Sequence, residues 1–155
     1  MPDRTAPYPA YNYIVSLGKE GRDPDKPLGG FSDVAGLNTE IHVSEYRDGN
    51  EKHPHVRKIP GAHTVGKVTL KRGVVNSADL WEWIKNIRRH GVEYQRDVTI
   101  TLRDEANTPV QLFKLFNVIP SKYTGPTLSG KGAGDVAMEE LELTAEGLEV
   151  LPAQA

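Results

Sequence analysis

The chain has 155 residues, and its 21 acidic and 19 basic side chains leave a net charge of −2. A charge this balanced argues against nucleic-acid binding, which usually shows as a basic footprint. The lack of cysteine excludes disulfides and thiolate metal sites. No apolar run reaches the roughly 18 residues that span a membrane, and no secretory signal is recognisable. We expect one domain, residues 1–155, made and assembled in the cytoplasm without stable membrane insertion.

The N-terminal part of the sequence predicts an extended N-terminal segment followed by short strands. Residues 1–10 contain three prolines and no periodic pattern, so we expect them to form an extended N-terminal arm, distinct from the rest of the domain. Alternating apolar and polar side chains predict a strand over 11–17 and shorter strands over 31–37 and 40–46. A charged loop rich in glycine and proline, 18–30, separates the first two strands.

Residues 47–66 are the least regular part of the sequence. They are mostly polar and show little periodicity, so they predict one long loop. Loops of this length are uncommon inside compact domains and are usually either functional or disordered. The segment is therefore a candidate functional region.

One helix is predicted, over residues 76–90, after a strand at 67–73. Asn76 and Ser77 offer side-chain oxygens to the free N–H groups of a helix start. Gly91 stands where a left-handed C-cap is favoured. Four apolar side chains recur at helical spacing and predict one buried stripe: Leu80, Trp83, Ile84 and Ile87.

The remaining sequence predicts further strands. Residues 95–103 alternate cleanly, and 110–118 are expected to pair with them as a hairpin. A Pro/Gly-rich loop or irregular edge strand is expected over 120–131, followed by strands at 136–143 and 148–151. In the strand at 136–143, the apolar side chains change from one face to the other near Leu141.

Together these elements predict a mainly β fold, in which two antiparallel sheets form a sandwich or small barrel flanked by one α-helix. The strands before residue 46 and those after residue 67 are the two groups from which we expect the sheets to form. A single helix cannot cover every sheet edge. Unpaired edges favour pairing with further copies of the chain.

Two glycine-rich motifs resemble nucleotide sites but lack the context that such sites need. Residues 61–68 nearly spell a P-loop, yet Val68 has no hydroxyl for magnesium and a strand follows in place of a helix. Residues 130–134, GKGAG, likewise lack the strand–turn–helix arrangement of a dinucleotide site. No cofactor is therefore expected.

Metal and catalytic sites are disfavoured as well. Four histidines lie in or just before the polar segment: His42, His53, His55 and His63. No carboxylate stands out as their partner, so solvated histidines are favoured over a zinc site. Glu140 and Glu142 share a strand face, where like charges usually mark a solvated or interface surface. No serine or threonine occupies a nucleophile elbow, so we do not expect an enzyme.

Trp81 is the residue that a monomer explains least well. It lies about 100° around the helix from Leu80 and widens the apolar stripe. One interpretation is that it packs under a loop. The other is that it anchors a subunit contact, because tryptophan is favoured at interface centres. The sequence leaves both open.

Seven sequence elements occur in one order along the chain: FSDVAGL at 31–37, EYRDG at 45–49, KIPG at 58–61, TLKRG at 69–73 with LWEW at 80–83, DVTI at 97–100, NVIPSK at 117–122 with GP at 125–126, and ELEL at 140–143 with EGL at 146–148. In this combination the chain, from 13 to 150, resembles the tail tube proteins of contractile phages and of phage-derived extracellular contractile injection systems.

The resemblance implies a barrel-like double sheet with a flanking helix, assembled as hexameric rings that stack into a hollow tube. The ring protein of type VI secretion shares this architecture. The implied role is structural: the inner tube of a phage virion or of a phage-tail-like particle released from the cell, through which cargo protein or DNA passes when the sheath contracts. Implied partners are further copies, the sheath, baseplate, spike and tube-terminating proteins, with no sequence-specific nucleic-acid binding.

Within this family we expect the oligomer contacts on the polar loop and on the helix. Arg47 and Asp48 would help to set register, and Gly49 would make the turn. The helix with Trp81 would face outward, toward sheath or baseplate, and Thr99 and Thr101 would suit a water-filled lumen. The interface candidates are Glu45, Tyr46, Arg47, Asp48, Gly49, Pro60, Gly61 and Trp81.

Two other functions compete with a main tube subunit. The first is a baseplate-proximal tube initiator of the same family, which would be present in few copies per particle. The second is a monomeric β-barrel that binds a small ligand. It predicts an apolar cavity and a monomer in solution.

Overall fold

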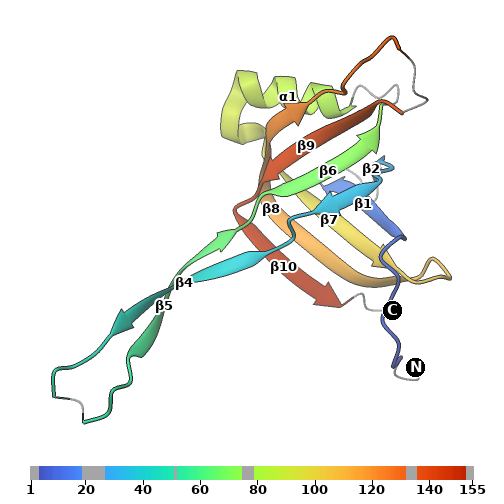
Figure 1. The fold of residues 1–155 in the computed structure, drawn as a ribbon. Helices are drawn as coiled ribbons and strands as arrows, with labels where there is room; N and C mark the ends of the chain where they lie inside the picture. The colour runs from blue at the N-terminus through green and yellow to red at the C-terminus, as the bar shows by residue number, and fades with distance from the viewer. Residues whose placement is uncertain (1–3, 19–26, 51, 75–78, 132–135, 153–155) are drawn as a thin grey trace.

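The computed structural model describes residues 4–18, 27–50, 52–74, 79–131 and 136–152 (Figure 1). The strands and helices in chain order are β1 (Tyr13–Gly18), β2 (Pro27–Gly29), β3 (Asp33–Ala35), β4 (Thr39–Tyr46), β5 (Arg57–Val65), β6 (Val68–Gly73), α1 (Asp79–His90), the short 3₁₀ helix η1 (Gly91–Tyr94), β7 (Arg96–Arg103), β8 (Pro109–Thr124), β9 (Met138–Thr144) and β10 (Gly147–Pro152).

Two antiparallel sheets share the long strand β8 (Figure 1). The first, which we call the wide sheet, runs β2-β1-β7-β8-β10, and its pairs with β8 involve residues from Pro109 to Val118. The second, the narrow sheet, runs β8-β9-β6-β3 and uses the C-terminal part of β8. Among the described strands the path does not close, so the predicted double sheet is confirmed as a sandwich.

The grouping of strands by chain order was wrong. β1 and β2 join β7 in the wide sheet, whereas β3 joins β6 in the narrow one. Each sheet therefore combines a strand from before residue 46 with strands from after residue 67, because strands pair where their apolar faces can cover the same core. The hairpin predicted for 95–103 and 110–118 is confirmed as β7 and β8.

β8 passes from one sheet to the other at Asn117, which has a left-handed φ of 50°. Asparagine tolerates this conformation better than most residues. The backbone N–H of Asn117 donates to Asp97 Oδ1 at 3.1 Å, and its Nδ2 donates to Glu146 Oε2 at 2.8 Å. This corner lets β8 continue to Thr124, so the first residues of the segment 120–131, predicted as a loop or an irregular edge strand, are strand.

The core lies between the sheets and is closed on one side by α1. The predicted stripe is confirmed: Leu80, Trp83 and Ile84 are buried, and Ile87 packs against them. Trp83 Nε1 donates to the Tyr94 carbonyl at 3.0 Å, which ties α1 to η1. Gly91 has a φ of 63°, as its predicted C-cap role requires. The predicted N-cap residues, Asn76 and Ser77, lie outside the described residues.

β4 and β5 form a separate two-stranded ribbon, which we call the arm, and it projects far from the sandwich (Figure 1). The sequence predicted a loop over residues 47–66, but Arg57–Val65 is a strand. Its periodicity was invisible because nearly every residue of the arm is exposed on both faces. A strand without a buried face need not carry apolar alternation, and β5 has no regular one, whereas β4 shows it at Ile41 and Val43.

The root of the arm depends on Gly36. Its φ is 89°, and a Cβ at this position would lie 2.0 Å from the Lys67 carbonyl oxygen. Only glycine meets both demands. Beside it, the Gly66 N–H donates to the Asn38 carbonyl at 3.0 Å, where the chain leaves β5.

Gly36→Ala is therefore expected to destabilise the chain by about 2–3 kcal/mol, because the new Cβ adds a backbone clash to a strained φ. Urea unfolding of the monomeric chain measures the loss. Gly30→Ala is the matched control, since a Cβ there meets nothing within 4 Å. Equal stability of the two variants would contradict this account of the arm root.

Candidate assembly interface

The arm exposes apolar side chains that have no partner in the described part of the chain. Five large ones are between 41% and 52% exposed: Ile41, Val43, Tyr46, Val56 and Ile59. The register places Ile41, Val43 and Glu45 on one face of the ribbon, and Tyr46 with Ile59 on the other. A two-stranded ribbon is marginally stable alone in water, so the arm is suited to packing against another surface.

The predicted interface residues 45–49 lie near the far end of the arm. Glu45 and Lys58 face each other across the strands, with Lys58 Nζ 3.2 Å from Glu45 Oε1. Tyr46 Oη donates to Asp48 Oδ1 at 2.6 Å, and this hydrogen bond raises the pKa of Tyr46. Arg47 is exposed just past β4, and Gly49 lies in the turn that the sequence predicted.

Pro60 and Gly61 do not close a loop, as their motif suggested, but form a bulge within β5. Two steps along β4, from Ile41 to Val43, oppose three steps along β5, from His63 to Pro60. Proline has no N–H to donate and is tolerated in strands mainly at edges and bulges. A Cβ on Gly61 would lie 3.0 Å from the His42 carbonyl oxygen. The bulge therefore adds twist to the arm at its midpoint.

The wide sheet presents a mixed outer face and an open edge. Opposite the core side chains Val98 and Ile100, β7 carries half-buried Thr99 and Thr101. In register with these threonines lie two rows of side chains on neighbouring strands: Ser16, Lys114 and Glu149, and Ile14, Leu112 and Leu151. β8 is the only neighbour of β10 within the sheets of the described residues. One edge of the wide sheet thus has unpaired backbone groups.

Trp81 is separate from the arm and lies on the exposed side of α1. Its side chain is 40% exposed and makes an edge-on contact with Tyr123 of β8, with ring centroids 5.6 Å apart. The Arg88 guanidinium lies 5.6 Å from the centroid of the Trp81 ring. These two contacts hold the Trp81 ring from one side, and its role in a subunit contact stays a prediction.

Sequence reasoning missed a buried charged cluster in the narrow sheet. Arg72 Nε donates to Glu139 Oε1, and the two side chains are only 4% and 9% exposed. Tyr123 Oη donates to Glu139 Oε2 at 2.6 Å, which together with burial raises the pKa of Tyr123. A signal was present: Glu139 lies in phase with Leu141 and Leu143, and Arg72 with Leu70. Every second side chain of β9 is buried, so the change of face predicted near Leu141 does not occur.

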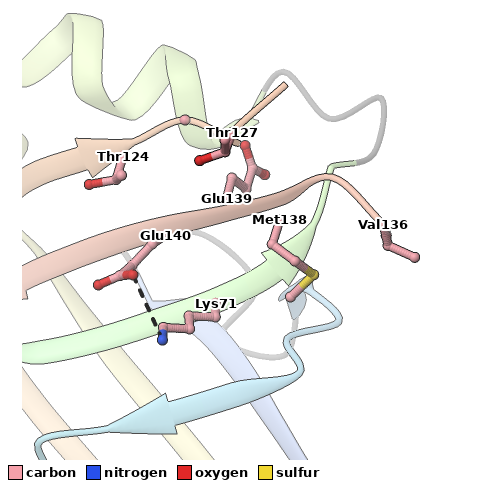
Figure 2. Close-up of a pocket in the computed structure, with 8 residues that line it drawn as sticks. Lys71, Thr124, Thr127, Val136, Met138, Glu139 and Glu140 are labelled. Atoms are coloured by element: carbon pink, nitrogen blue, oxygen red, sulfur yellow. Dashed lines mark ion pairs between the residues drawn. The ribbon is translucent and has the colours of Figure 1, made fainter. Parts of the chain in front are cut away.

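A surface hollow of about 450 Å³ lies beside this cluster, as Figure 2 shows. Val136 and Met138 give it an apolar part, while Lys71 and Glu140 form an ion pair of 3.9 Å along it (Figure 2). Val136 is 73% exposed, so the hollow is open to solvent. It does not have the character of the enclosed apolar cavity that a small-ligand barrel requires.

The N-terminal segment is fixed to the turn between β7 and β8. Both terminal nitrogens of Arg4 lie 2.9 Å from the carboxylate oxygens of Glu105, and its guanidinium lies over the Tyr8 ring. This bidentate pairing lowers the pKa of Glu105 to about 2 from an ordinary 4.5. The carboxylate therefore stays charged and paired until the pH falls toward 2.

Arg4→Gln is expected to raise the pKa of Glu105 toward its ordinary value, because the main group that stabilises its charged form is lost. An NMR titration of the Glu105 side chain measures the shift. Arg89→Gln, which removes an exposed arginine on α1, is the control and should leave that titration unchanged. A Glu105 midpoint that stays near 2 in Arg4→Gln would show that another group depresses it.

Two further properties concern possible ligands and membranes. The described residues contain no group of three or more histidine, aspartate or glutamate side chains that could hold a metal. His53 and His55 on the arm are a pair, with ring centroids 6.0 Å apart. None of the described helices combines the length and the apolar character needed to cross a membrane.

Residues 9–149 match the family model of the T4-like virus tail tube protein gp19. The chain belongs to this family. This confirms the resemblance drawn from the seven sequence elements, and the chain is a tail tube protein, a structural subunit of the tube of a contractile injection system.

Solved structures agree with this assignment. A chain of the PVC sheath–tube complex, from an extracellular contractile injection system in its extended state, is 30% identical, with a TM-score of 0.80 over 96% of this chain and 94% of that one. A chain of the tube-terminating cap of the anti-feeding prophage is 28% identical, with a TM-score of 0.81 over 97% and 95%. No curated protein sequence matches the chain.

The relation to type VI secretion is one of fold. A type six secretion system protein is 10% identical, with a TM-score of 0.54 over 91% of this chain and 83% of that one. At this identity only the architecture is shared.

Proposed function

We propose that this tail tube protein forms hexameric rings that stack into the rigid inner tube of a contractile particle. The observation that carries the proposal is the arm, a long ribbon with exposed apolar side chains that nothing in the described subunit covers. Exposed apolar surface of this kind marks a site of contact with another molecule, and in a tube that molecule is a further copy of the subunit. The arm therefore supplies the contact between stacked rings.

Within a ring, neighbouring copies join at the edges of the wide sheet. The unpaired side of β10 offers backbone donors and acceptors along Gly147–Pro152. An open strand edge is a template for pairing with another chain, and closure into a ring removes such edges. Ring closure by this edge accounts for the open path of the described strands in the single subunit.

The wide sheet then lines the lumen. Its outer face carries Thr99 and Thr101, flanked by Lys114 and Glu149, whose charges cancel. Polar interiors are usual for wide, water-filled β-barrels. The lumen serves as the conduit for cargo protein or DNA, and a sheath subunit surrounds the tube, as the PVC relative occurs in a sheath–tube complex. Baseplate, spike and cap proteins complete the particle, which forms in the cytoplasm.

Negative-stain electron microscopy of the purified chain tests this proposal. Hollow tubes or six-fold rings are expected at high protein concentration, with a baseplate protein added as nucleus if spontaneous assembly is slow. A chain that stays monomeric by light scattering under all these conditions would contradict it. In purified particles, many copies per particle would support a main tube subunit, and a few copies would support the tube initiator instead.

A further inference from the structure

Most histidines of the chain lie on the arm. Of the five, His42 is in β4, His63 is in β5, His53 and His55 lie in the connection between these strands, and His90 ends α1. Histidine is the side chain whose charge ordinarily changes between pH 5 and 8. The element that we assign to ring stacking therefore gains positive charge as the pH falls through this range.

His63 lies within the apolar face of the arm, which we define as Ile41, Val43, Pro60 and His63. His63 is opposite Ile41 in the register, and Val43 with Pro60 forms the next pair on the same face. Ile41 and Val43 are each nearly half exposed, and His63 is exposed beside them. The arm extends away from both sheets (Figure 1), so this face is open to a further copy. A surface that packs on the two aliphatic side chains covers His63 as well.

The carboxylates of the arm strands are placed where they do little for a charged His63. Glu45 lies on the same face, beyond Val43, but its carboxylate is paired with Lys58 Nζ at 3.2 Å. Glu40 belongs to the opposite face, which it shares with His42. An imidazolium at His63 would therefore rely on water for its solvation.

β10 also approaches β5, and Glu149 is the titratable side chain of that strand. Glu149 stands opposite Lys114 of β8 in the register of the wide sheet. Cross-strand neighbours of opposite charge stabilise each other. This carboxylate, too, has a cation of its own within the subunit.

Stacking on the apolar face favours the neutral form of His63, because burial among apolar groups disfavours a charged imidazolium. An unperturbed histidine titrates near pH 6.5. Above that pH a neutral imidazole can pack together with Ile41 and Val43. Below it, stacking must either release the bound proton or bury the charge. By linkage, the contact loses free energy as the pH falls, because the free subunit then binds more protons than the stacked one.

We propose that His63 is a pH switch for the stacking of rings, an inference that rests on the proposed function. Neutral His63 lets the apolar face of the arm pack against a further copy, and protonated His63 opposes that contact. Tubes are therefore stable near neutral pH and lose subunits in mildly acidic solution. The subunit itself stays folded over this range, because His63 lies outside the core.

The test measures the lowest subunit concentration at which tubes form, by sedimentation and negative-stain microscopy, from about pH 5 to about pH 7.5. For the unmodified chain this concentration should rise by up to about tenfold for each pH unit below about 6.5, the limit for one proton released per subunit. His63→Gln stays neutral and should remove most of this dependence. His63→Lys stays charged and should raise the concentration at least about tenfold even at neutral pH.

His42→Gln is the matched control, because it removes a histidine from the opposite face of the same ribbon, and it should keep the pH dependence of the unmodified chain. The inference is overturned if unmodified tubes are indifferent to pH, or if His63→Gln tubes dissolve in acid as unmodified tubes do. Unfolding of the free subunit over the same range, measured by circular dichroism, would overturn it as well. Failure of the unmodified chain to form tubes at neutral pH would instead contradict the proposed function.

Discussion

Replacing residues 44–59 by an Asn-Gly turn is expected to abolish tube formation while leaving the subunit folded. The cut joins Val43 to Pro60, which face each other in the ribbon, and Asn-Gly suits a two-residue hairpin turn. None of the described side chains in the removed segment belongs to the core. Negative-stain microscopy measures tube formation, and light scattering should show a monomer.

Thermal melting provides the control for this variant. Because the trimmed segment is exposed, its removal should shift the melting temperature by only a few degrees. A second, milder variant, Val43→Ser/Ile59→Ser, keeps the length of the arm and removes two of its apolar contacts, so it should slow assembly without preventing folding. Tubes of normal length from the trimmed chain would rule out the role of the arm in stacking.

Arg72→Met is expected to destabilise the subunit by about 3–5 kcal/mol, because it leaves the buried Glu139 carboxylate without its cation. Tyr123 remains as a hydrogen-bond donor to Glu139 but carries no charge to balance it. Urea unfolding, at a concentration where the chain stays monomeric, measures the change in the free energy of unfolding.

The neighbouring ion pair supplies the matched control for Arg72→Met. Lys71 and Glu140 occupy the adjacent position in the same two strands, but their side chains are 49% and 41% exposed. Lys71→Met should therefore cost only about 0–1 kcal/mol. The double variant Arg72→Met/Glu139→Met should recover much of the loss, since it leaves no unpaired charge. Equal effects of Arg72→Met and Lys71→Met would show that burial does not decide the strength of these pairs.

Several predictions from sequence held because their signals are local. The stripe Leu80, Trp83, Ile84 and Ile87 repeats within one helix, so the periodicity alone located α1 and its buried face. The β7–β8 hairpin likewise follows from alternation on either side of a short turn. The family resemblance used the order of short elements along the chain, and no knowledge of their contacts was needed.

The second strand of the arm, β5, and the buried pair escaped prediction for two different physical reasons. β5 is exposed on both faces, so no alternation marked it as a strand. Glu139 is in phase with Leu141 and Leu143, but it lies within an acidic run, and its partner Arg72 stands 67 residues earlier in the chain. Charge in a sequence indicates exposure unless a distant opposite charge compensates it.

The amino-acid sequence by itself determined the β-rich class, the helix and its core stripe, and membership of the tail tube family, because these depend on neighbouring residues or on their order. Only the tertiary structure decided how strands divide between the two sheets, that residues 57–65 extend an exposed arm, and why Gly36 and Asn117 stand where they do. Each of these depends on contacts between residues far apart in the chain. Local patterns carry no information about such contacts until the fold brings them together.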